Sequence, residues 1–270
     1  MNDCKIIAVA NRKGGVGKTT VSLNLGYALA EQGYRILLVD FDSQANLSKG
    51  LGIAEPAKDE HTISQPMCAD MRDLELPYKA SYIKQHGKLH FISCNETLSV
   101  LELEMVGAMR REYILSNILE ELRHDYDFIL IDSGPSLGVL TVNALMAADS
   151  VLIISTPESD SNEGTKLLVK SIQLVRKKYR HPLEVNGILM NMVTDRMILT
   201  REMMEETRRD FGEAVTVYQT TIPRTSQFGR AKKAQQSIFE FAPRGKGGAA
   251  MRVFCQEFIA EGGYEDGKAG

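Results

Sequence analysis

The sequence predicts an α/β fold, a doubly wound and mostly parallel sheet with helices on both faces. Short runs rich in apolar and β-branched residues recur along the chain and alternate with stretches of helical periodicity. These runs are apolar almost throughout rather than at every second residue, which is typical of strands covered on both faces. A glycine-rich stretch also stands between the first expected strand and the first expected helix, a position where α/β proteins bind phosphates.

The expected strands are short and nearly continuous in apolar character. They are Ile6–Ala10, Ile36–Asp40, Leu89–Ser93, Phe128–Asp132, Val151–Ser155, Val185–Asn191 and Val215–Gln219. Pro135 and Pro157 each follow one of these strands closely, where the chain must turn. The spacing between the strands leaves room for helical crossovers, as a parallel sheet requires.

The expected helices lie between the strands and carry apolar residues at helical spacing. They are Lys18–Gln32, Glu112–His124, Leu137–Ala148, Gly164–Lys178, Thr200–Phe211 and Gly248–Glu261. Residues 53–88 show the least periodicity and contain three prolines, so we expect a peripheral excursion there. We therefore expect one domain over residues 1–262 and a flexible, glycine-rich tail over residues 263–270.

Composition excludes several classes of protein. Of the 270 residues, 43% are hydrophobic and 25% are charged, which is ordinary globular usage and excludes a largely disordered chain. No apolar run approaches the ~18 residues of a membrane span, and the N-terminus does not resemble a signal peptide, so we expect a cytoplasmic protein. The four cysteines form no C-x-x-C pair, which excludes a local zinc or iron–sulfur site and predicts reduced, mostly buried thiols.

The net charge of −3 conceals an uneven distribution along the chain. Residues 1–170 contain 16 Lys and Arg against 23 Asp and Glu, a balance of −7. Residues 171–254 contain 15 basic and 8 acidic residues, a balance of +7. A basic C-terminal half indicates a polyanionic partner, although solvated helix faces produce the same count.

The glycine-rich stretch fits a phosphate-binding loop in variant form. Residues 11–20 read NRKGGVGKTT, with a strand before them and a helix after them. Glycines allow successive backbone N–H groups to form an anion-binding concavity, and the following helix adds its positive N-terminal end. We expect Lys18 to neutralise the β- and γ-phosphates of a nucleotide and the Thr19 hydroxyl to bind Mg²⁺.

Acidic residues follow two other strands, at the sheet edge where ligands bind. Asp132 comes after four apolar residues, and we expect it to hold Mg²⁺ directly or through water. Asp40 and Asp42 alternate at period two, which places them on one face of an extended segment. They either orient magnesium-bound and attacking waters or belong to an ordinary solvated turn.

These segments resemble the ParA/MinD superfamily, and the ParA/Soj family in particular. Residues 13–20, KGGVGKTT, look like its deviant Walker A motif, in which an extra lysine opens the loop. Residues 39–48 are similar to its switch segment, and residues 126–138 to its Walker B segment. Shorter matches to the ParA/Soj branch lie at residues 139–145, 221–224 and 241–243. The likeness covers residues 4–260 and is weakest over 53–100.

The resemblance implies a P-loop ATPase that partitions chromosomes or plasmids. In that family ATP, with Mg²⁺, drives formation of a sandwich homodimer, and the dimer binds double-stranded DNA without sequence preference. A ParB-type centromere-binding partner then stimulates slow hydrolysis. The implied location is cytoplasmic and associated with the nucleoid.

The resemblance also implies roles for individual residues. Lys13 would be the signature lysine that reaches the phosphates of the other subunit, and Asp42 would be the aspartate needed for hydrolysis. Lys13, Lys18 and Asp42 are thus the expected catalytic residues, and Thr19, Asp42 and Asp132 the expected magnesium site. The expected nucleotide contacts are Lys13, Gly14, Gly15, Val16, Gly17, Lys18, Thr19 and Thr20, with Asn191 and Pro223 near the base.

The chain departs from the family pattern in two places. Ser43 and Gly134 stand where relatives usually have proline, so both loops are expected to move more freely. Residues 156–163 lack the Gln and Glu that usually follow the proline there. The sequence therefore does not determine how this segment would contact a partner protein or a second subunit.

Other members of the superfamily are disfavoured by features of the chain. A MinD-like protein should end in a basic amphipathic helix, whereas residues 258–266 are acidic and interrupted by glycine. An iron–sulfur carrier needs clustered cysteines, and an arsenite-pump ATPase normally has two P-loops. A ParA-like ATP switch that positions a protein cargo, or regulates division or replication, stays as the alternative function.

DNA binding is expected to come from the basic surface of the C-terminal half. About a dozen residues precede the P-loop, so an N-terminal helix-turn-helix that reads an operator is not expected. The candidate phosphate contacts are Arg196, Arg224, Arg230, Lys232 and Lys233, with the stretch from Arg224 to Lys233 preferred.

Overall fold

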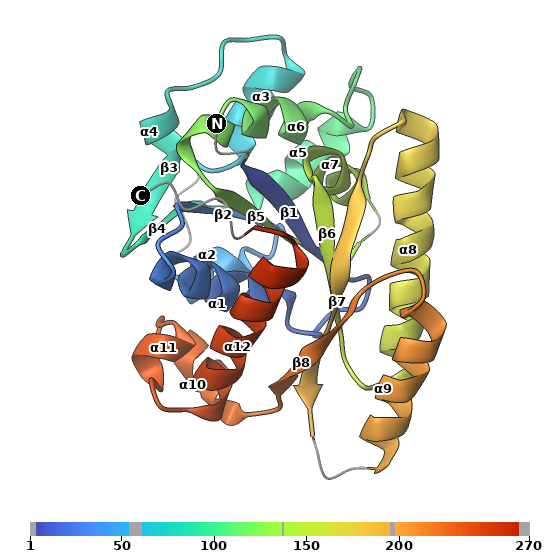
Figure 1. Cartoon of the computed structure of the whole chain (residues 1–270). Helices are drawn as coiled ribbons and strands as arrows, with labels where there is room; N and C mark the ends of the chain where they lie inside the picture. Colours follow the sequence, from blue (N-terminus) through green and yellow to red (C-terminus); the bar gives the residue numbers. More distant parts are fainter. Residues whose placement is uncertain (1–3, 54–60, 137, 195–197, 265–270) are drawn as a thin grey trace.

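The computed structural model describes residues 4–53, 61–136, 138–194 and 198–264. Its centre is an eight-stranded sheet with the strand order β3-β4-β2-β5-β1-β6-β7-β8 (Figure 1). Every neighbouring pair is parallel except β3 and β4, which confirms the predicted doubly wound, mostly parallel sheet. The strands are β1 (Lys5–Ala10), β2 (Ile36–Phe41), β3 (Ile83–His86), β4 (Leu89–Ile92), β5 (Phe128–Ser133), β6 (Ser150–Ser155), β7 (Glu184–Val193) and β8 (Val217–Pro223).

Helices cover both faces of this sheet (Figure 1). The longer ones are α1 (Lys18–Glu31), α3 (Ser64–Met71), α5 (Thr97–Met105), α7 (Val139–Ala147), α8 (Ser159–Tyr179), α9 (Ile198–Phe211), α10 (Ser226–Lys233) and α12 (Lys246–Glu261). The shorter ones are α2 (Asn46–Gly50), α4 (Lys79–Tyr82), α6 (Ile114–Glu120) and α11 (Ile238–Phe241). No helix among the described residues is both long enough and apolar enough to cross a membrane.

Two apolar cores lie on opposite faces of the sheet because successive strand residues point to opposite sides. In β1, Ile6 and Ala8 belong to one core, together with residues of α5, α6, α7 and α8. Ile7 and Val9 belong to the other, together with residues of α1 and α12. This explains the continuous apolar strands seen in the sequence, since each residue of β1 from Ile6 to Ala10 is buried on one side or the other.

The seven predicted strands are all present. Their ends shift by one or two residues, except that β8 ends four residues later than predicted, at Pro223. Strand β3 was not predicted, because its sequence IKQH has a single apolar residue. It pairs with β4 as an antiparallel edge hairpin, with Gly87 in the turn at φ 58°. The excursion predicted over residues 53–88 therefore contains β3 as well as α3 and α4.

The helix predicted over Glu112–His124 is interrupted. Helix α6 ends at Glu120, and a separate 3₁₀ turn covers Arg123–Asp125. Helices α2, α5, α10 and α11 were not predicted. The sequence of α10, SQFGRAKK, is mostly polar and offers little apolar periodicity for sequence analysis to detect.

The end of the described chain packs against the domain. Tyr264 lies within the predicted tail, yet its ring contacts Phe128 and Phe258, with ring centroids 5.1 and 5.4 Å away. Its hydroxyl accepts a hydrogen bond from the Asn186 amide at 3.1 Å. The division at residue 262 stays a prediction. Three of the four cysteines are buried, Cys68 is half-buried, and all four thiols are free.

Candidate nucleotide-binding site

The glycine-rich loop joins β1 to α1 at the carboxyl edge of the sheet. Gly15 and Gly17 have φ values of 79° and 92°, in the left-handed region that favours glycine. A Cβ atom on Gly17 would lie 2.2 Å from Nδ2 of Asn191, so this position also needs the absence of a side chain. Gly14 and Gly15 are exposed and Val16 is buried, which leaves the loop's backbone open toward solvent at its tip.

The two lysines of the loop have different surroundings. Lys18 is buried, and its ammonium donates hydrogen bonds to the carbonyl oxygens of Asn11 at 3.1 Å and Lys13 at 3.3 Å. Burial lowers the pKa of Lys18, and the carboxylates of Asp132 and Asp42 oppose that shift. Lys13 is more exposed, and its Nζ lies 2.7 Å from Oε2 of Glu158, in the loop after β6.

A buried carboxylate stands beside Lys18 at the end of β5. One oxygen of Asp132 accepts a hydrogen bond from the Ser22 hydroxyl at 3.0 Å, and the other, Oδ2, has no hydrogen-bond partner among the residues that the structure describes. Burial raises the pKa of Asp132 to about 6, while the hydroxyls of Thr19 and Ser22 and the charge of Lys18 hold it down. An oxygen left unpartnered in a buried site fits a hard cation such as Mg²⁺.

Asp40 is buried beneath the site, and its carboxylate is hydrogen-bonded to other residues of the protein. It pairs in register with Asp132 across β2 and β5. Its Oδ2 accepts hydrogen bonds from the backbone N–H of Ser48 at 2.8 Å and the Ser48 hydroxyl at 2.7 Å. Burial and the neighbouring Asp132 raise the pKa of Asp40 to about 7. Asp40 thus holds α2 in place through Ser48, and both of its oxygens already accept hydrogen bonds within the protein.

Asp42 lies where two loops meet. Its Oδ1 accepts a hydrogen bond from the Gln44 N–H at 3.0 Å, and its carbonyl accepts one from the Ala45 N–H at 2.7 Å. On the other side, a Cβ atom on Gly134 would lie 3.5 Å from the carboxyl carbon of Asp42. The loop after β2 and the loop after β5 are therefore in contact through Asp42 and Gly134.

The two residues expected near the base lie on the adjacent strands. Asn191 in β7 is buried, and its side-chain amide donates a hydrogen bond to the carbonyl of Val16 at 2.7 Å. The next residue, Met192, has φ 56°, unusual for a non-glycine residue. Pro223 ends β8 and pairs with Val193. The structure thus brings Asn191 against the P-loop and places Pro223 two residues further along the same edge.

Three of the basic candidates come together on α10. Arg230, Lys232 and Lys233 are exposed, and Arg224 is exposed just before the helix. Lys232 donates a hydrogen bond to Oδ1 of Asn46 at 3.0 Å, which ties α10 to the first residue of α2. The guanidinium of Arg230 lies 5.4 Å from the ring centroid of Phe241. Arg196 lies outside the described residues.

Sequence analysis missed two contributors to this site. Ser22 follows Lys18 by one helical turn, and that spacing is a signal that could have placed it on the same face of α1. Glu158 carries no such signal, because its contact with Lys13 depends on β6 lying next to β1.

This fold and this loop define a P-loop nucleoside-triphosphate-binding protein of the deviant Walker A type. A family described as "AAA domain" matches residues 4–185. The sporulation initiation inhibitor protein Soj of Bacillus subtilis is 38% identical over 258 residues, which cover 96% of this chain and 99% of that protein. The chromosome partitioning protein ParA of Caulobacter vibrioides is 35% identical, over 96% of this chain and 95% of that protein.

A solved structure agrees with this assignment. The cobyrinic acid a,c-diamide synthase of Mycobacterium smegmatis, with bound ATP analogue and magnesium, superposes with a TM-score of 0.81 at 28% identity. The match covers 98% of this chain and 97% of that one. The chain belongs to the ParA/Soj family of the ParA/MinD superfamily.

Proposed function

We propose that this protein is an ATP-dependent DNA-segregation ATPase of the ParA type. ATP and Mg²⁺ bind at the P-loop, two subunits form a homodimer around the nucleotides, and the dimer binds double-stranded DNA without sequence preference. A ParB-type partner accelerates slow hydrolysis and so releases the DNA. We place the protein in the cytoplasm, on the nucleoid. The observation that carries the proposal is the additional lysine of the loop, Lys13, whose half-buried side chain pairs with Glu158 and stands apart from the buried Lys18.

Nucleotide binding would rearrange the contacts of Lys18. In the structure its ammonium donates hydrogen bonds to two backbone carbonyls of the loop, those of Asn11 and Lys13. Phosphate oxygens are stronger acceptors than carbonyls because they carry charge. We infer that Lys18 leaves these carbonyls for the β- and γ-phosphates, and that the loop backbone opens its N–H groups toward the same oxygens.

The residues near Asp132 fit a magnesium ion. Oδ2 of Asp132 is buried and has no hydrogen-bond partner in the described part of the chain, and the Thr19 hydroxyl is next to this carboxylate. When bound there, Mg²⁺ would neutralise negative charge on the phosphates. Asp132 and Thr19 would hold the ion, partly through water, and Ser22 would keep the carboxylate oriented through its hydrogen bond.

Asp42 is proposed to orient the attacking water. Its carboxylate lies at the junction of the two loops that border the P-loop, and it is only half-buried. Phosphoryl transfer depends on the position of the nucleophile, so a carboxylate that accepts a hydrogen bond from water contributes through geometry. Asp40 is excluded from this role because Ser48 occupies its Oδ2.

DNA binding is proposed to use α10. Its basic residues are exposed, and Lys232 contacts Asn46 in the helix that follows the Asp42 loop. If ATP rearranges that loop, the hydrogen bond between Asn46 and Lys232 would transmit the movement to the basic residues of α10. Dimerisation would double the number of basic residues facing the same duplex.

The test is DNA binding by the purified full chain with ATP, ADP or no nucleotide. We expect binding of unrelated duplexes with ATP alone, and a fall in affinity of ~10³-fold or more between 50 and 200 mM salt if several phosphates are contacted. Equal binding with ADP, or binding that ignores salt, would refute DNA segregation. ATP-dependent dimerisation without DNA binding would favour the alternative, an ATP switch that positions a protein cargo.

A further inference from the structure

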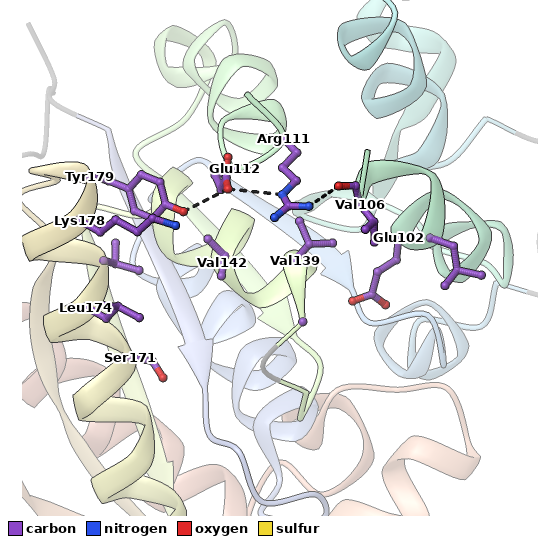
Figure 2. Close-up of a pocket in the computed structure, with 13 residues that line it drawn as sticks. Glu102, Val106, Arg111, Glu112, Val139, Val142, Ser171, Leu174, Lys178 and Tyr179 are labelled. Carbon is purple, nitrogen blue, oxygen red and sulfur yellow. Dashed lines mark hydrogen bonds and ion pairs between the residues drawn. The ribbon is translucent and has the colours of Figure 1, made fainter. Parts of the chain in front are cut away.

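A groove separate from the P-loop opens on the outer surface of one helical layer. Its walls are α5 and α8, and α7 lies between them (Figure 2). The cavity within it measures about 580 Å³. We call it the α5–α8 groove. It is distinct from the nucleotide site, since none of the predicted nucleotide-binding residues lines it.

The surface of the α5–α8 groove is apolar well beyond the cavity itself. Leu103 and Val106 are 75% and 64% exposed on the α5 side, and Leu174 is 61% exposed on the α8 side. Met109, in the turn after α5, is 91% exposed. Large apolar side chains gathered in this way usually mark an interaction site. A small molecule inside the cavity would leave much of this surface in water, whereas a protein segment laid along the groove would cover it.

Some of the charged side chains around the groove form hydrogen bonds or ion pairs with one another, whereas others do not. Toward the end of α8, the Tyr179 hydroxyl donates a hydrogen bond to Oε1 of Glu112 at 3.1 Å, and Nε of Arg111 donates to the same oxygen at 3.4 Å. Arg111 also donates to the carbonyl of Val106 (Figure 2). These groups form a fixed polar network at that end of the groove. The exposed Lys178, whose ammonium lies 4.9 Å from the ring centroid of Tyr179, adds a positive charge there.

Glu102 is different, because it forms no hydrogen bond or ion pair with any residue that the structure describes. Its side chain is half-buried and reaches from α5 toward the start of α7, where a Cβ atom on Gly138 would lie 2.2 Å from its Oε1. A carboxylate that is partly removed from water gains most from a cationic partner. The α5–α8 groove therefore combines an exposed apolar surface with a negative charge on its α5 side, opposite the cation of Lys178 on its α8 side.

We propose that the α5–α8 groove binds an amphipathic segment of a partner protein. The apolar side chains of that segment would cover Leu103 and Leu174, and its lysine or arginine would pair with Glu102. The charge of Glu102 selects this occupant, because an acidic or purely apolar segment would leave the carboxylate repelled or unpaired.

A segment bound at Glu102 would also affect the nucleotide site, because Glu102 lies beside a loop that contacts Asp42. Gly138 precedes α7 and ends the loop that follows β5, and Gly134 of the same loop lies against Asp42. A segment bound beside Glu102 and Gly138 would restrict this loop and so alter turnover. This consequence rests on the proposed function, whereas binding to the groove does not.

A displayed library of random 16-residue peptides, selected on the nucleotide-free full chain, tests the proposal. We expect enrichment of peptides with an apolar stripe and a lysine or arginine. Binding of the synthesised peptide, followed by fluorescence anisotropy, should weaken about tenfold or more in Glu102→Lys and in Leu103→Ser. A charge-reversed peptide carrying Glu in place of its basic residue should regain affinity for Glu102→Lys. Because no nucleotide is needed, a failure of the proposed ATPase cycle would leave this measurement intact.

Matched controls separate the groove from general surface effects. Glu104→Gln changes a carboxylate on the same helix that pairs with Arg72 instead of lining the groove, and it should bind the peptide as wild type does. Val253→Ser removes an exposed apolar side chain on α12 and should also have no effect. Absence of enriched peptides, enrichment of acidic ones, or affinity unchanged in both groove variants would overturn the proposal. Concentration-dependent self-association that Leu103→Ser abolishes would also overturn it and assign the groove to a second copy of this chain.

Discussion

Lys13 and Glu158 form a 2.7 Å ion pair between the opening of the P-loop and the loop that follows β6. The pair lies at the surface, with side-chain exposures of 26% and 51%. If Lys13 must reach the phosphates of a second subunit, it has to leave Glu158 first. The ion pair would then hold the signature lysine of the single subunit away from its partner's nucleotide.

Removing the carboxylate should therefore favour the dimer. An exposed ion pair contributes at most about 1 kcal/mol, and dimerisation would break one pair in each subunit. Glu158→Gln should therefore lower the protein concentration needed for ATP-dependent dimerisation by up to about thirtyfold. Sedimentation velocity with ATP and Mg²⁺ measures this. Glu163→Gln, an exposed change in the same segment, serves as the control. Weaker dimerisation of Glu158→Gln would mean that Glu158 itself contributes to the dimer.

Substitution of Lys18 and of Lys13 should impair different steps of the ATPase cycle. Lys18→Ala removes the buried ammonium beside Asp132 and should abolish nucleotide binding. Lys13→Ala should retain most of the binding but neither dimerise nor hydrolyse ATP. Binding of a fluorescent ATP analogue and sedimentation on the same samples distinguish these outcomes. Normal dimerisation of Lys13→Ala would refute its role across the interface.

Asp42 should be needed for hydrolysis and dispensable for binding. In the proposed function the P-loop backbone, Lys18 and Thr19 would hold the nucleotide, so Asp42→Ala should leave ATP affinity within about tenfold, ~1.4 kcal/mol. Turnover should fall to background, and the variant should accumulate as the ATP-bound dimer on DNA. A single-turnover assay decides the matter, because hydrolysis at the wild-type rate would assign water positioning to another group.

Much of the fold could be predicted because the apolar strands and the P-loop carry strong local signals. Edge strand β3 and helix α10 could not, because their sequences are mostly polar and their place depends on neighbours. At the site, sequence spacing singled out Lys18 and Asp132, which lie side by side in the structure. The ion pair between Lys13 and Glu158 depends on the order of strands in the sheet, which no local pattern encodes.

The aromatic cluster under α12 should dominate the stability of that side of the sheet. Phe254 is fully buried, and its ring centroid lies 5.0 Å from that of Tyr218 and 6.1 Å from that of Phe258. Phe254→Ala should lower the free energy of unfolding by about 3–5 kcal/mol, through lost burial and the cavity left behind. Urea unfolding of the nucleotide-free protein measures the change. Val253→Ala, at a neighbouring exposed position, should stay within about 0.5 kcal/mol of wild type.

The buried carboxyl of Asp40 should make the stability of the nucleotide-free protein depend on pH. Burial raises its pKa from 3.8 to about 7, so the folded state binds a proton that the unfolded chain has already released. This contribution is fully present below about pH 4 and is lost as pH rises through 7.

Asp40→Asn cannot ionise and can still accept the hydrogen bonds of Ser48, so its stability should improve relative to wild type by about 2 kcal/mol between pH 5.5 and 8.5. Urea unfolding in EDTA at several pH values measures the difference. Asp125→Asn, which changes an exposed carboxylate that pairs with Lys79, is the control. A difference between Asp40→Asn and wild type that stays constant over this range would mean that Asp40 is ionised throughout, with its charge balanced by Ser48 and the neighbouring backbone.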